Sequence, residues 1–175
     1  MQSRITVLGD TLTGKTSLIL SYTKEGFFAS LPRTVLDKYI VEAEWQASSS
    51  GKALLTIFDV CSEPSILDPH LRSQVSDVFI LVYDRTNRES FCSVIDLWIP
   101  KVARYGKPII CVGTKSDLSV AEPLDTKMLC SAASMHGLIC DCKETSASLR
   151  EGVEAIFLRA LEFTSLPSAR CCVLL

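Results

Sequence analysis

The sequence predicts an α/β fold: one domain with a six-stranded, mostly parallel sheet and helices on both faces. Three observations predict it. Short apolar runs alternate along the chain with segments of helix length, which is typical of a parallel sheet wrapped by helices. A chain of 175 residues, 47% of them hydrophobic, fits one domain with a substantial core. A glycine-punctuated turn joins the first apolar run to the first segment of helix length.

The expected elements follow one another in a regular order. The six expected strands are Ile5–Leu8, Lys38–Gln46, Ala53–Phe58, Val78–Tyr83, Ile109–Val112 and Leu138–Cys142. The five expected helices are Lys15–Lys24, Ser65–Val75, Arg88–Arg104, Pro123–His136 and Arg150–Phe163. The polar stretch 47–52 suits a hairpin, so the second and third strands are expected to be antiparallel at one edge of the sheet. Residues 26–37 show neither the helical nor the strand spacing of apolar residues, and they are expected to form a loop. We expect the domain to span residues 1–163, followed by a C-terminal tail over residues 164–175.

Composition excludes several classes of protein. A formal net charge of −2 argues against a nucleic-acid binder that relies on a basic surface. Apolar runs all fall short of the roughly 20 residues that a membrane-spanning helix needs. The first four residues lead directly into a strand and not into a signal peptide. We therefore expect a cytosolic chain, and a monomer.

Eight cysteines would indicate a disulfide framework only in a secreted chain. Several of them lie inside expected core elements, so reduced, buried thiols are expected instead. Cys111 falls within an expected strand, and Cys92 and Cys130 fall on expected helices. The pair Cys140-Asp141-Cys142 is too closely spaced for the usual zinc knuckle, and no second pair with a histidine follows it. A metal site is therefore not expected there.

Residues 9–16 read Gly-Asp-Thr-Leu-Thr-Gly-Lys-Thr and lie between an expected strand and an expected helix. This is the context in which such a pattern forms a phosphate-binding loop. Glycines let the backbone curl so that successive N–H groups point at phosphate oxygens. Lys15 adds a charge near the β and γ phosphates, and the Thr16 hydroxyl can ligate Mg²⁺. The alternative is a strand-to-helix turn without a ligand.

The segment Thr114-Lys115-Ser116-Asp117 indicates which nucleotide binds. It follows the fifth expected strand directly, at the edge of the sheet where ligands bind in such folds. The carboxylate of Asp117 can accept hydrogen bonds from N1–H and the 2-amino group of guanine, whereas adenine offers neither donor. The stem of Lys115 can lie along the plane of the base. A solvated loop is the alternative for these four residues taken alone.

The chain as a whole, from Arg4 to its C-terminus, resembles the Ras superfamily of small GTPases, nearest the Rho/Rac branch. The segments that carry the resemblance are the phosphate loop Gly9–Ser17, the first switch loop Pro32–Tyr39, the strand-ending pair Phe58-Asp59, the two guanine loops Thr114–Asp117 and Thr145–Ala147, and the helical segment Leu97–Val102. The resemblance implies the Ras-like P-loop NTPase fold. Only 28 residues separate Asp117 from Ser146, too few for the extra helix that most Rho proteins carry there. The chain is therefore expected to be an atypical, shortened relative.

The resemblance implies a site for GTP or GDP with Mg²⁺. Thr34, which lies 25 positions after Gly9, would reach Mg²⁺ and the γ-phosphate only in the GTP state. Asp59 would hold the metal through water, beside Thr16. Phe27 would pack edge-on against the base. Taken singly, Phe27 could instead be a core aromatic, Thr34 an ordinary loop residue and Asp59 a strand-end cap.

The remaining nucleotide contacts follow from the same resemblance. The backbone N–H of Ala147 would donate to the guanine oxygen, with Thr145 and Ser146 shaping that loop. Further contacts are implied for the phosphate-loop residues Leu12, Thr13, Gly14, Lys15, Thr16 and Ser17.

Three departures from the family concern GTP hydrolysis. Thr11 stands where most relatives have glycine and would crowd the attacking water and an incoming arginine finger. Ser62 replaces the glycine whose N–H meets the γ-phosphate, so the loop is expected to move less on nucleotide exchange. Glu63 replaces the water-orienting glutamine and lacks its amide donor. With Lys15 and Thr34, Thr11 and Glu63 complete the expected catalytic residues, and we expect slow hydrolysis or a different geometry.

The tail Cys172-Val173-Leu174-Leu175 fits a C-a-a-X prenylation motif whose terminal leucine favours geranylgeranyl. Cys171 is a candidate for palmitoylation, because one prenyl chain alone binds membranes only reversibly. Arg170 is the one basic residue from Ala160 onward, so a polybasic second anchor is missing. The alternative is an unmodified apolar terminus. These residues predict a place on the cytoplasmic face of a membrane.

The leading hypothesis is a guanine-nucleotide switch whose loops bind effector proteins in the GTP state. Exchange factors and a prenyl-binding dissociation inhibitor are the other partners that the resemblance implies. A second hypothesis is a GTP-locked adaptor that does not turn over, favoured by Thr11, Ser62 and Glu63. A third is a P-loop kinase or ATPase, against which Asp117 and the segment Ser146-Ala147 argue.

Overall fold

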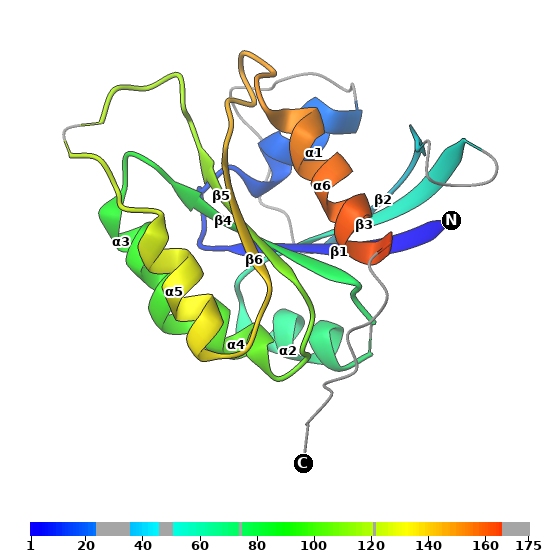
Figure 1. Cartoon of the computed structure of the whole chain (residues 1–175), viewed down its shortest axis with the longest axis horizontal. Helices are drawn as coiled ribbons and strands as arrows, with labels where there is room; N and C mark the ends of the chain where they lie inside the picture. Colours follow the sequence, from blue (N-terminus) through cyan, green and yellow to red (C-terminus); the bar gives the residue numbers. More distant parts are fainter. Residues whose placement is uncertain (24–35, 46–50, 74, 121, 166–175) are drawn as a thin grey trace.

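The computed structural model describes residues 1–23, 36–45, 51–73, 75–120 and 122–165. Its centre is a six-stranded sheet with the strand order β2-β3-β1-β4-β5-β6 (Figure 1). The strands are β1 (Gln2–Gly9), β2 (Leu36–Glu44), β3 (Lys52–Val60), β4 (Val78–Asp84), β5 (Ile109–Thr114) and β6 (Cys140–Glu144). Among these strands β2 and β3 pair antiparallel and every other neighbouring pair is parallel. The expected sheet and its edge hairpin are thereby confirmed.

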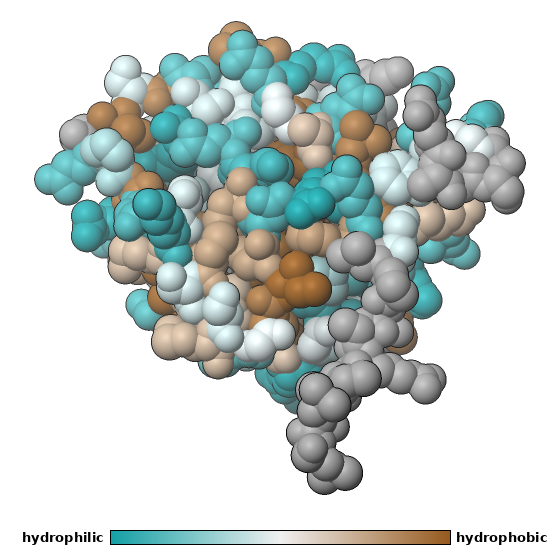
Figure 2. All heavy atoms as spheres, viewed as in Figure 1, coloured by the Kyte–Doolittle hydropathy of each residue, from teal (hydrophilic) through white to brown (hydrophobic). Residues whose placement is uncertain are grey.

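Helices cover both faces of the sheet, as the sequence predicts. On one face lie α1 (Lys15–Thr23) and α6 (Val153–Ser165) (Figure 1). On the other face lie α2 (Pro64–Ser73), α3 (Arg88–Ser93), α4 (Ile99–Ala103) and α5 (Lys127–Met135). Each face has its own buried cluster, with Phe157 and Ile80 in the first and Trp98 and Phe79 in the second. The sheet is therefore the middle of three layers. Figure 2 gives the same view in space-filling form, with hydrophilic and hydrophobic residues interspersed over the visible face.

The central strands are apolar at nearly every position because both of their faces are covered. All seven residues of β4 are buried, and so are all six of β5. Parallel strands that are buried on both faces have continuous hydrophobic sequences. Both strands end in polar residues, Asp84 and Thr114, at the carboxyl edge of the sheet. The same edge carries the loop after β1.

The expected helix Arg88–Arg104 is interrupted. Asn87 caps α3 by accepting hydrogen bonds from the N–H groups of Glu89 and Ser90. A π-helical turn, η1 (Val94–Trp98), follows, and the N–H of Ile99 donates to the carbonyl of Val94. Pro100 has no N–H, and its ring would clash with the carbonyl four residues earlier. The wider turn just before the proline relieves that conflict.

Two other expected helices begin later than the sequence suggests. Helix α5 begins at Lys127 and not at Pro123, because the carboxylate of Asp125 accepts the Lys127 N–H at 3.0 Å and ends the preceding turn. Helix α6 begins at Val153 because Arg150 and Gly152 have φ of 61° and 70°, which no right-handed helix contains. Strand β6 covers Cys140–Glu144, two residues later than the expected range.

The described cysteines are free thiols, but they are not uniformly buried. Cys111 is buried, whereas Cys92 is exposed, so the expectation for Cys92 was wrong. Cys61, Cys130, Cys140 and Cys142 are half-buried. Within the described part of the chain, no helix is both long enough and apolar enough to cross a membrane.

Candidate functional site

The phosphate loop connects β1 to α1 in the left-handed backbone conformations that such a loop needs. Gly9 and Gly14 have φ of 145° and 94°. A β-carbon at Gly9 would lie 2.2 Å from the carbonyl oxygen of Val82, so only glycine fits there. Leu12 also has positive φ, 65°, and its side chain is 86% exposed. The loop closes onto the helix through the Leu18 N–H, which donates to the Gly14 carbonyl at 2.9 Å.

Lys15 lies in the centre of this loop. Its ammonium donates to the carbonyls of Gly9 at 2.9 Å and Asp10 at 2.7 Å. Burial lowers the pKa of the Lys15 ammonium, although the carboxylates of Asp59 and Asp10 act in the opposite direction. The charge is thus held on the inner side of the loop, where an anion cradled by the backbone N–H groups would meet it.

Thr16 and Asp59 come together from α1 and β3. The Thr16 hydroxyl donates to the Asp59 carboxylate at 2.5 Å, and the Asp59 side chain is buried. A hydroxyl beside a carboxylate at the end of a phosphate loop is the hard-oxygen donor set that Mg²⁺ prefers. These residues therefore fit a magnesium ion, and Lys15 with the curled loop fits the phosphates beside it.

The segment after β5 is tied directly to the phosphate loop. The Thr114 hydroxyl lies 2.5 Å from the Thr13 carbonyl and 3.1 Å from that of Tyr83. Lys115 has a left-handed φ of 60°, and its ammonium pairs with the Asp84 carboxylate at 2.5 Å. Burial acts to raise the pKa of Asp84, but hydrogen bonds from Lys115 and Thr86 outweigh it and the pKa is lowered. The strand ends of β4 and β5 thus hold the phosphate loop from one side.

Asp117 meets the loop that follows β6. The Ser146 hydroxyl donates to the Asp117 carboxylate at 2.6 Å and accepts the Leu149 N–H at 3.1 Å. The hydrogen bond from Ser146 lowers the pKa of the Asp117 carboxyl. Ser146 is buried while Asp117 is exposed. A buried hydroxyl therefore fixes the position of a carboxylate that faces solvent.

Backbone hydrogen bonds hold the loop 145–151 in one shape. Thr145 donates its N–H to the Gly113 carbonyl at 2.9 Å and its hydroxyl to the Glu151 carbonyl at 2.7 Å. Ser146 and Glu151 exchange two backbone hydrogen bonds. The Ala147 carbonyl accepts the Ser21 hydroxyl at 3.1 Å, which links the loop to α1. The structure therefore brings the phosphate loop and both expected guanine loops to one edge of the sheet.

The three departures from the family lie beside the phosphate loop. The hydroxyl oxygens of Thr11 and Ser62 are 3.4 Å apart, and Thr11 is exposed. Glu63 is exposed, and its carboxylate accepts the Ser65 hydroxyl at 2.8 Å. The Glu63 carbonyl accepts the N–H groups of Ile66 and Leu67, so Glu63 directly precedes α2 and accepts its first backbone hydrogen bonds.

Two site residues were not identified from the sequence. Asp84 pairs with Lys115, and its place at the end of an apolar strand was the available signal. Trp98 donates its indole N–H to the Asp10 carboxylate at 2.8 Å and so supports the phosphate loop from η1. The expected residues Phe27, Thr34, Cys171 and Cys172 lie outside the described residues.

Comparison with known proteins agrees with this geometry. The model of the Ras family matches residues 4–165. The Rho-related protein racM of Dictyostelium discoideum is 30% identical over 177 residues, which cover 93% of this chain and 89% of racM. The GTP-binding protein RHO4 of Saccharomyces cerevisiae is 29% identical over 170 residues, covering 90% of this chain and 56% of RHO4. RHO4 of Eremothecium gossypii is 35% identical over 127 residues, covering 70% of this chain and 48% of RHO4.

The chain thus spans most of racM and about half of each RHO4 protein. The family match covers all of the sheet except the first two residues of β1, together with the phosphate loop and both loops that meet at Asp117 and Ser146. The chain therefore belongs to the Ras superfamily of small GTPases, near its Rho branch, and is a member of a family of GTP-binding switches.

Proposed function

We propose that the chain is a magnesium-dependent guanine-nucleotide switch with slow GTP hydrolysis. The observation that carries the proposal is the hydrogen bond from Ser146 to Asp117. It joins two residues that 28 others separate in the chain, and it fixes a carboxylate at the edge of the sheet next to the phosphate loop. A fixed carboxylate selects guanine, because adenine lacks the two donors that it would accept.

Phosphate and metal binding would fall to the residues of the phosphate loop. Lys15 would turn from the Gly9 and Asp10 carbonyls to the phosphate oxygens, and Thr16 and Asp59 would hold Mg²⁺, with Thr34 joining in the GTP state. Mg²⁺ neutralises charge on the β and γ phosphates when bound. Order in the first switch loop, Pro32–Tyr39, and in the second switch segment, Asp59–Glu63, would then depend on the γ-phosphate, as in other family members.

Slow hydrolysis is supported by the surroundings of Thr11. The Thr11 hydroxyl lies 3.4 Å from the Ser62 hydroxyl, and a side chain at this position would crowd an attacking water. Glu63 is bonded to Ser65 at the start of α2, and as a carboxylate it offers no amide donor to orient water. Both features act on the positioning of the attacking water, so each raises the activation free energy of GTP hydrolysis.

The contact between Thr11 and Ser62 also favours a second candidate, a GTP-locked adaptor that turns over too slowly to act as a timer. In that case the abundance and the membrane attachment of the protein would regulate it. Effectors would bind the same switch loops in both candidates.

Membrane attachment forms part of the proposal. Geranylgeranyl on Cys172, with palmitate on Cys171, would place the protein as a monomer on the cytoplasmic face of a membrane. Exchange factors and a prenyl-binding dissociation inhibitor are the corresponding partners. Cys172→Ser should release the protein from sedimented cell membranes and Cys171→Ser should release part of it. Unchanged sedimentation of Cys172→Ser would contradict prenylation.

The central experiment is to extract and identify the nucleotide from the purified protein and then to follow one turnover of bound GTP. We expect GDP or GTP, and Asp117→Asn should shift preference toward xanthine nucleotides, whose 2-oxo group needs a donor. Extracted ATP, or equal affinity for ATP and GTP, would contradict the guanine site. Stable GTP with no turnover over hours would favour the locked adaptor over the slow switch.

A further inference from the structure

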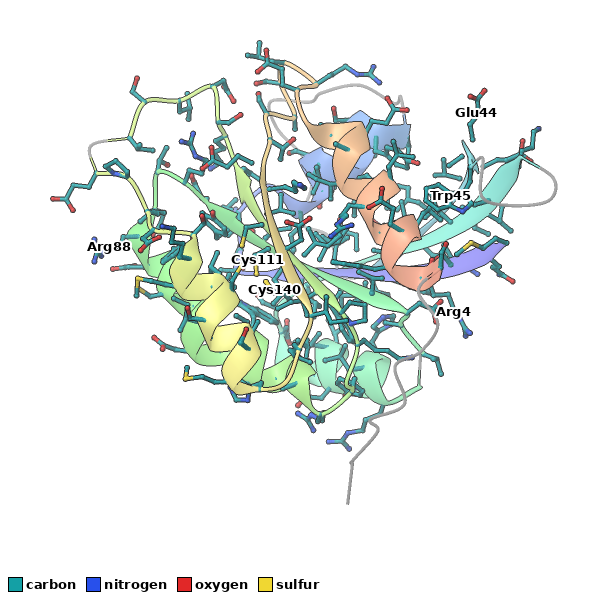
Figure 3. All side chains as sticks on the ribbon, viewed as in Figure 1. Arg4, Glu44, Trp45, Arg88, Cys111 and Cys140 are labelled. Carbon is teal, nitrogen blue, oxygen red and sulfur yellow. The ribbon has the colours of Figure 1, made fainter. Side chains whose placement is uncertain are left out.

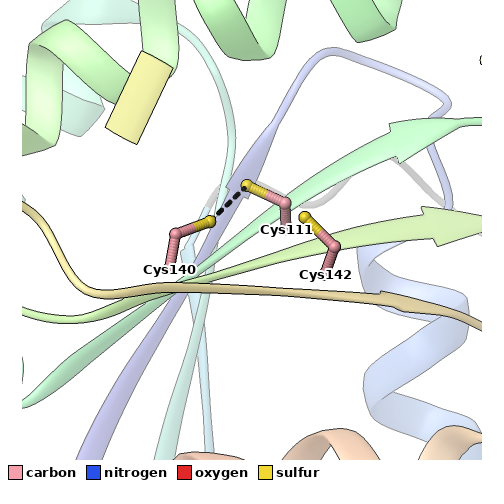
Figure 4. Close-up of side chains that lie close together, drawn as sticks. All are labelled: Cys111, Cys140 and Cys142. Carbon is pink, nitrogen blue, oxygen red and sulfur yellow. Dashed lines mark hydrogen bonds between the residues drawn. The ribbon is translucent and has the colours of Figure 1, made fainter. Parts of the chain in front are cut away.

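Four cysteines from three elements form a thiol cluster below the carboxyl edge of the sheet. Cys111 comes from β5, Cys140 and Cys142 from β6, and Cys130 from α5. The Sγ atoms of Cys111 and Cys140 are 3.8 Å apart (Figure 4). Cys130 Sγ lies 3.9 Å from that of Cys140 and 3.4 Å from that of Cys142. The Sγ atoms of Cys111, Cys140 and Cys142 all lie within 4.8 Å of one another.

Strand geometry explains why these thiols converge. Side chains alternate along a strand, so Cys140 and Cys142 share one face of β6. Cys111 is the direct register partner of Cys142 on the neighbouring strand. The intervening Asp141 points to the opposite face, where its carboxylate accepts the Arg159 Nε–H at 2.8 Å from α6. Helix α5 then supplies Cys130, whose Sγ atom lies near those of Cys140 and Cys142. Figure 3 shows Cys111 and Cys140 next to each other on neighbouring strands.

The spacing of the sulfur atoms is that of a metal site. A thiolate lies about 2.3 Å from Zn²⁺, so the ligands of a tetrahedral zinc site lie about 3.8 Å apart. The sulfur–sulfur distances of 3.4, 3.8 and 3.9 Å in the cluster bracket this value. All four cysteines are free thiols and not disulfides. Packing of neutral thiols in the core remains as the ordinary alternative.

Access and ligand chemistry agree with a metal. Strand β6 is the edge of the sheet, and Cys130, Cys140 and Cys142 are half-buried, so an ion can reach the sulfur atoms from solvent. Thiolates are soft ligands that select ions of the zinc class over Mg²⁺ or Ca²⁺. We propose that Cys111, Cys130, Cys140 and Cys142 bind one tetrahedral Zn²⁺-class ion, each ligating thiol releasing its proton to solvent.

The thiol cluster lies close in the chain to both guanine loops. Cys111 lies three residues before Thr114, and Cys142 lies three residues before Thr145. An ion held there would tie β5, β6 and α5 together directly below both guanine loops. Binding to the folded chain alone raises thermal stability. We expect a saturating amount of Zn²⁺ to raise the melting temperature on the order of 5 °C.

The test uses the full chain carrying Cys171→Ser and Cys172→Ser, which removes the tail thiols as competing ligands. Protein reduced and stripped with chelator is titrated with Co²⁺. We expect one equivalent to bind, with the near-ultraviolet thiolate charge-transfer band and the visible bands of tetrahedral cobalt. Zn²⁺ should displace it, and elemental analysis should find one zinc per chain.

Variants separate the cluster from other thiols. Cys142→Ser and Cys130→Ser should each weaken Co²⁺ binding at least tenfold and abolish most of the melting shift. Cys92→Ser is the matched control, because Cys92 is an exposed thiol on α3 outside the cluster. Cys130→Ser changes a half-buried helix position and keeps the test valid if Cys142→Ser fails to fold. Circular dichroism confirms folding, and no readout depends on nucleotide.

Three outcomes would overturn the proposal. The first is the absence of tetrahedral cobalt bands in the reduced protein. The second is an equal loss of binding in Cys92→Ser and in the cluster variants. The third is a disulfide within the cluster, found by mass spectrometry in protein that binds no metal.

Discussion

The hydroxyl oxygens of Thr11 and Ser62 lie 3.4 Å apart, although 51 positions separate the two residues in the chain. One belongs to the phosphate loop and the other to the segment after β3. Both replace glycines of the family to which the chain belongs, so the two replacements face each other. This contact links the phosphate loop directly to the second switch segment, Asp59–Glu63.

This contact leads to a prediction about hydrolysis. Thr11→Gly combined with Glu63→Gln should raise single-turnover GTP hydrolysis on the order of tenfold, because together they free and orient one attacking water. Each change alone should do less, since residues acting on one group are not additive. The measurement is phosphate release from preloaded protein. If the natural protein already hydrolyses GTP briskly and the double variant is no faster, slow hydrolysis is wrong.

Ser62→Gly, made both in the natural sequence and in Thr11→Gly, tests the contact itself. Removing the hydroxyl should increase hydrolysis further only where Thr11 is retained, because Thr11→Gly already breaks the contact. The coupling is read from a double-mutant cycle of Thr11→Gly and Ser62→Gly. Strictly additive effects would mean that the two side chains act independently.

The hydrogen bond from Ser146 predicts how Asp117 is held. Ser146→Ala should weaken GDP binding on the order of tenfold to a hundredfold, because a hydrogen bond to a charged group contributes about 1.5–3 kcal/mol. Ser146 lowers the pKa of Asp117. The variant should therefore raise that pKa toward its ordinary value, and affinity should begin to fall at a higher pH on acidification. Ser119→Ala, an exposed change in the same segment, is the control. Titration of a fluorescent GDP analogue measures the affinities, and equal affinities for the two variants would contradict this role.

The pair Thr16 and Asp59 predicts metal dependence. Thr16→Ala should abolish most of the difference in nucleotide affinity between magnesium and chelator, because it removes a direct hard-oxygen ligand. Lys15→Ala should instead weaken binding under both conditions, because it removes a charge contact to phosphate. Dissociation rates of labelled GDP with and without chelator separate the two cases. Unchanged rates in both variants would make the loop merely structural.

His70 predicts the dependence of stability on pH. Burial lowers the pKa of its imidazole below 6.5, and the ring packs edge-on against Phe58 with centroids 5.0 Å apart. The unfolded chain therefore takes up the proton at a higher pH than the folded chain does. The free energy of unfolding should fall as pH falls below about 6.5 and level off once pH passes the folded pKa.

Urea unfolding between about pH 8 and about pH 5 checks this dependence. His70→Gln should flatten the pH profile, whereas the exposed His136→Gln should leave it unchanged. An identical slope in wild type and His70→Gln would assign the pH dependence to other groups.

The sequence alone determined the order of the elements and the two motifs that identify the family. Periodicity and glycine placement are local, so the apolar runs of β4 and β5 and the phosphate loop could be read directly. The motif Thr114–Asp117 is contiguous, and its position after a strand was enough to place it. The helix ends were predicted less accurately, because side chains such as Asp125 compete with the helix for backbone N–H groups.

Tertiary structure alone decided which distant residues touch. Lys115 pairs with Asp84 because neighbouring parallel strands end at the same level. Thr11 faces Ser62 because β1 and β3 are neighbours in the sheet. The spacing of Cys140 and Cys142, with one residue between them, argues from the sequence against a metal site. The register of β5 against β6, and the packing of α5, then added Cys111 and Cys130. Sequence spacing measures distance along the chain, whereas a ligand set depends on distances in space that only strand register and packing fix.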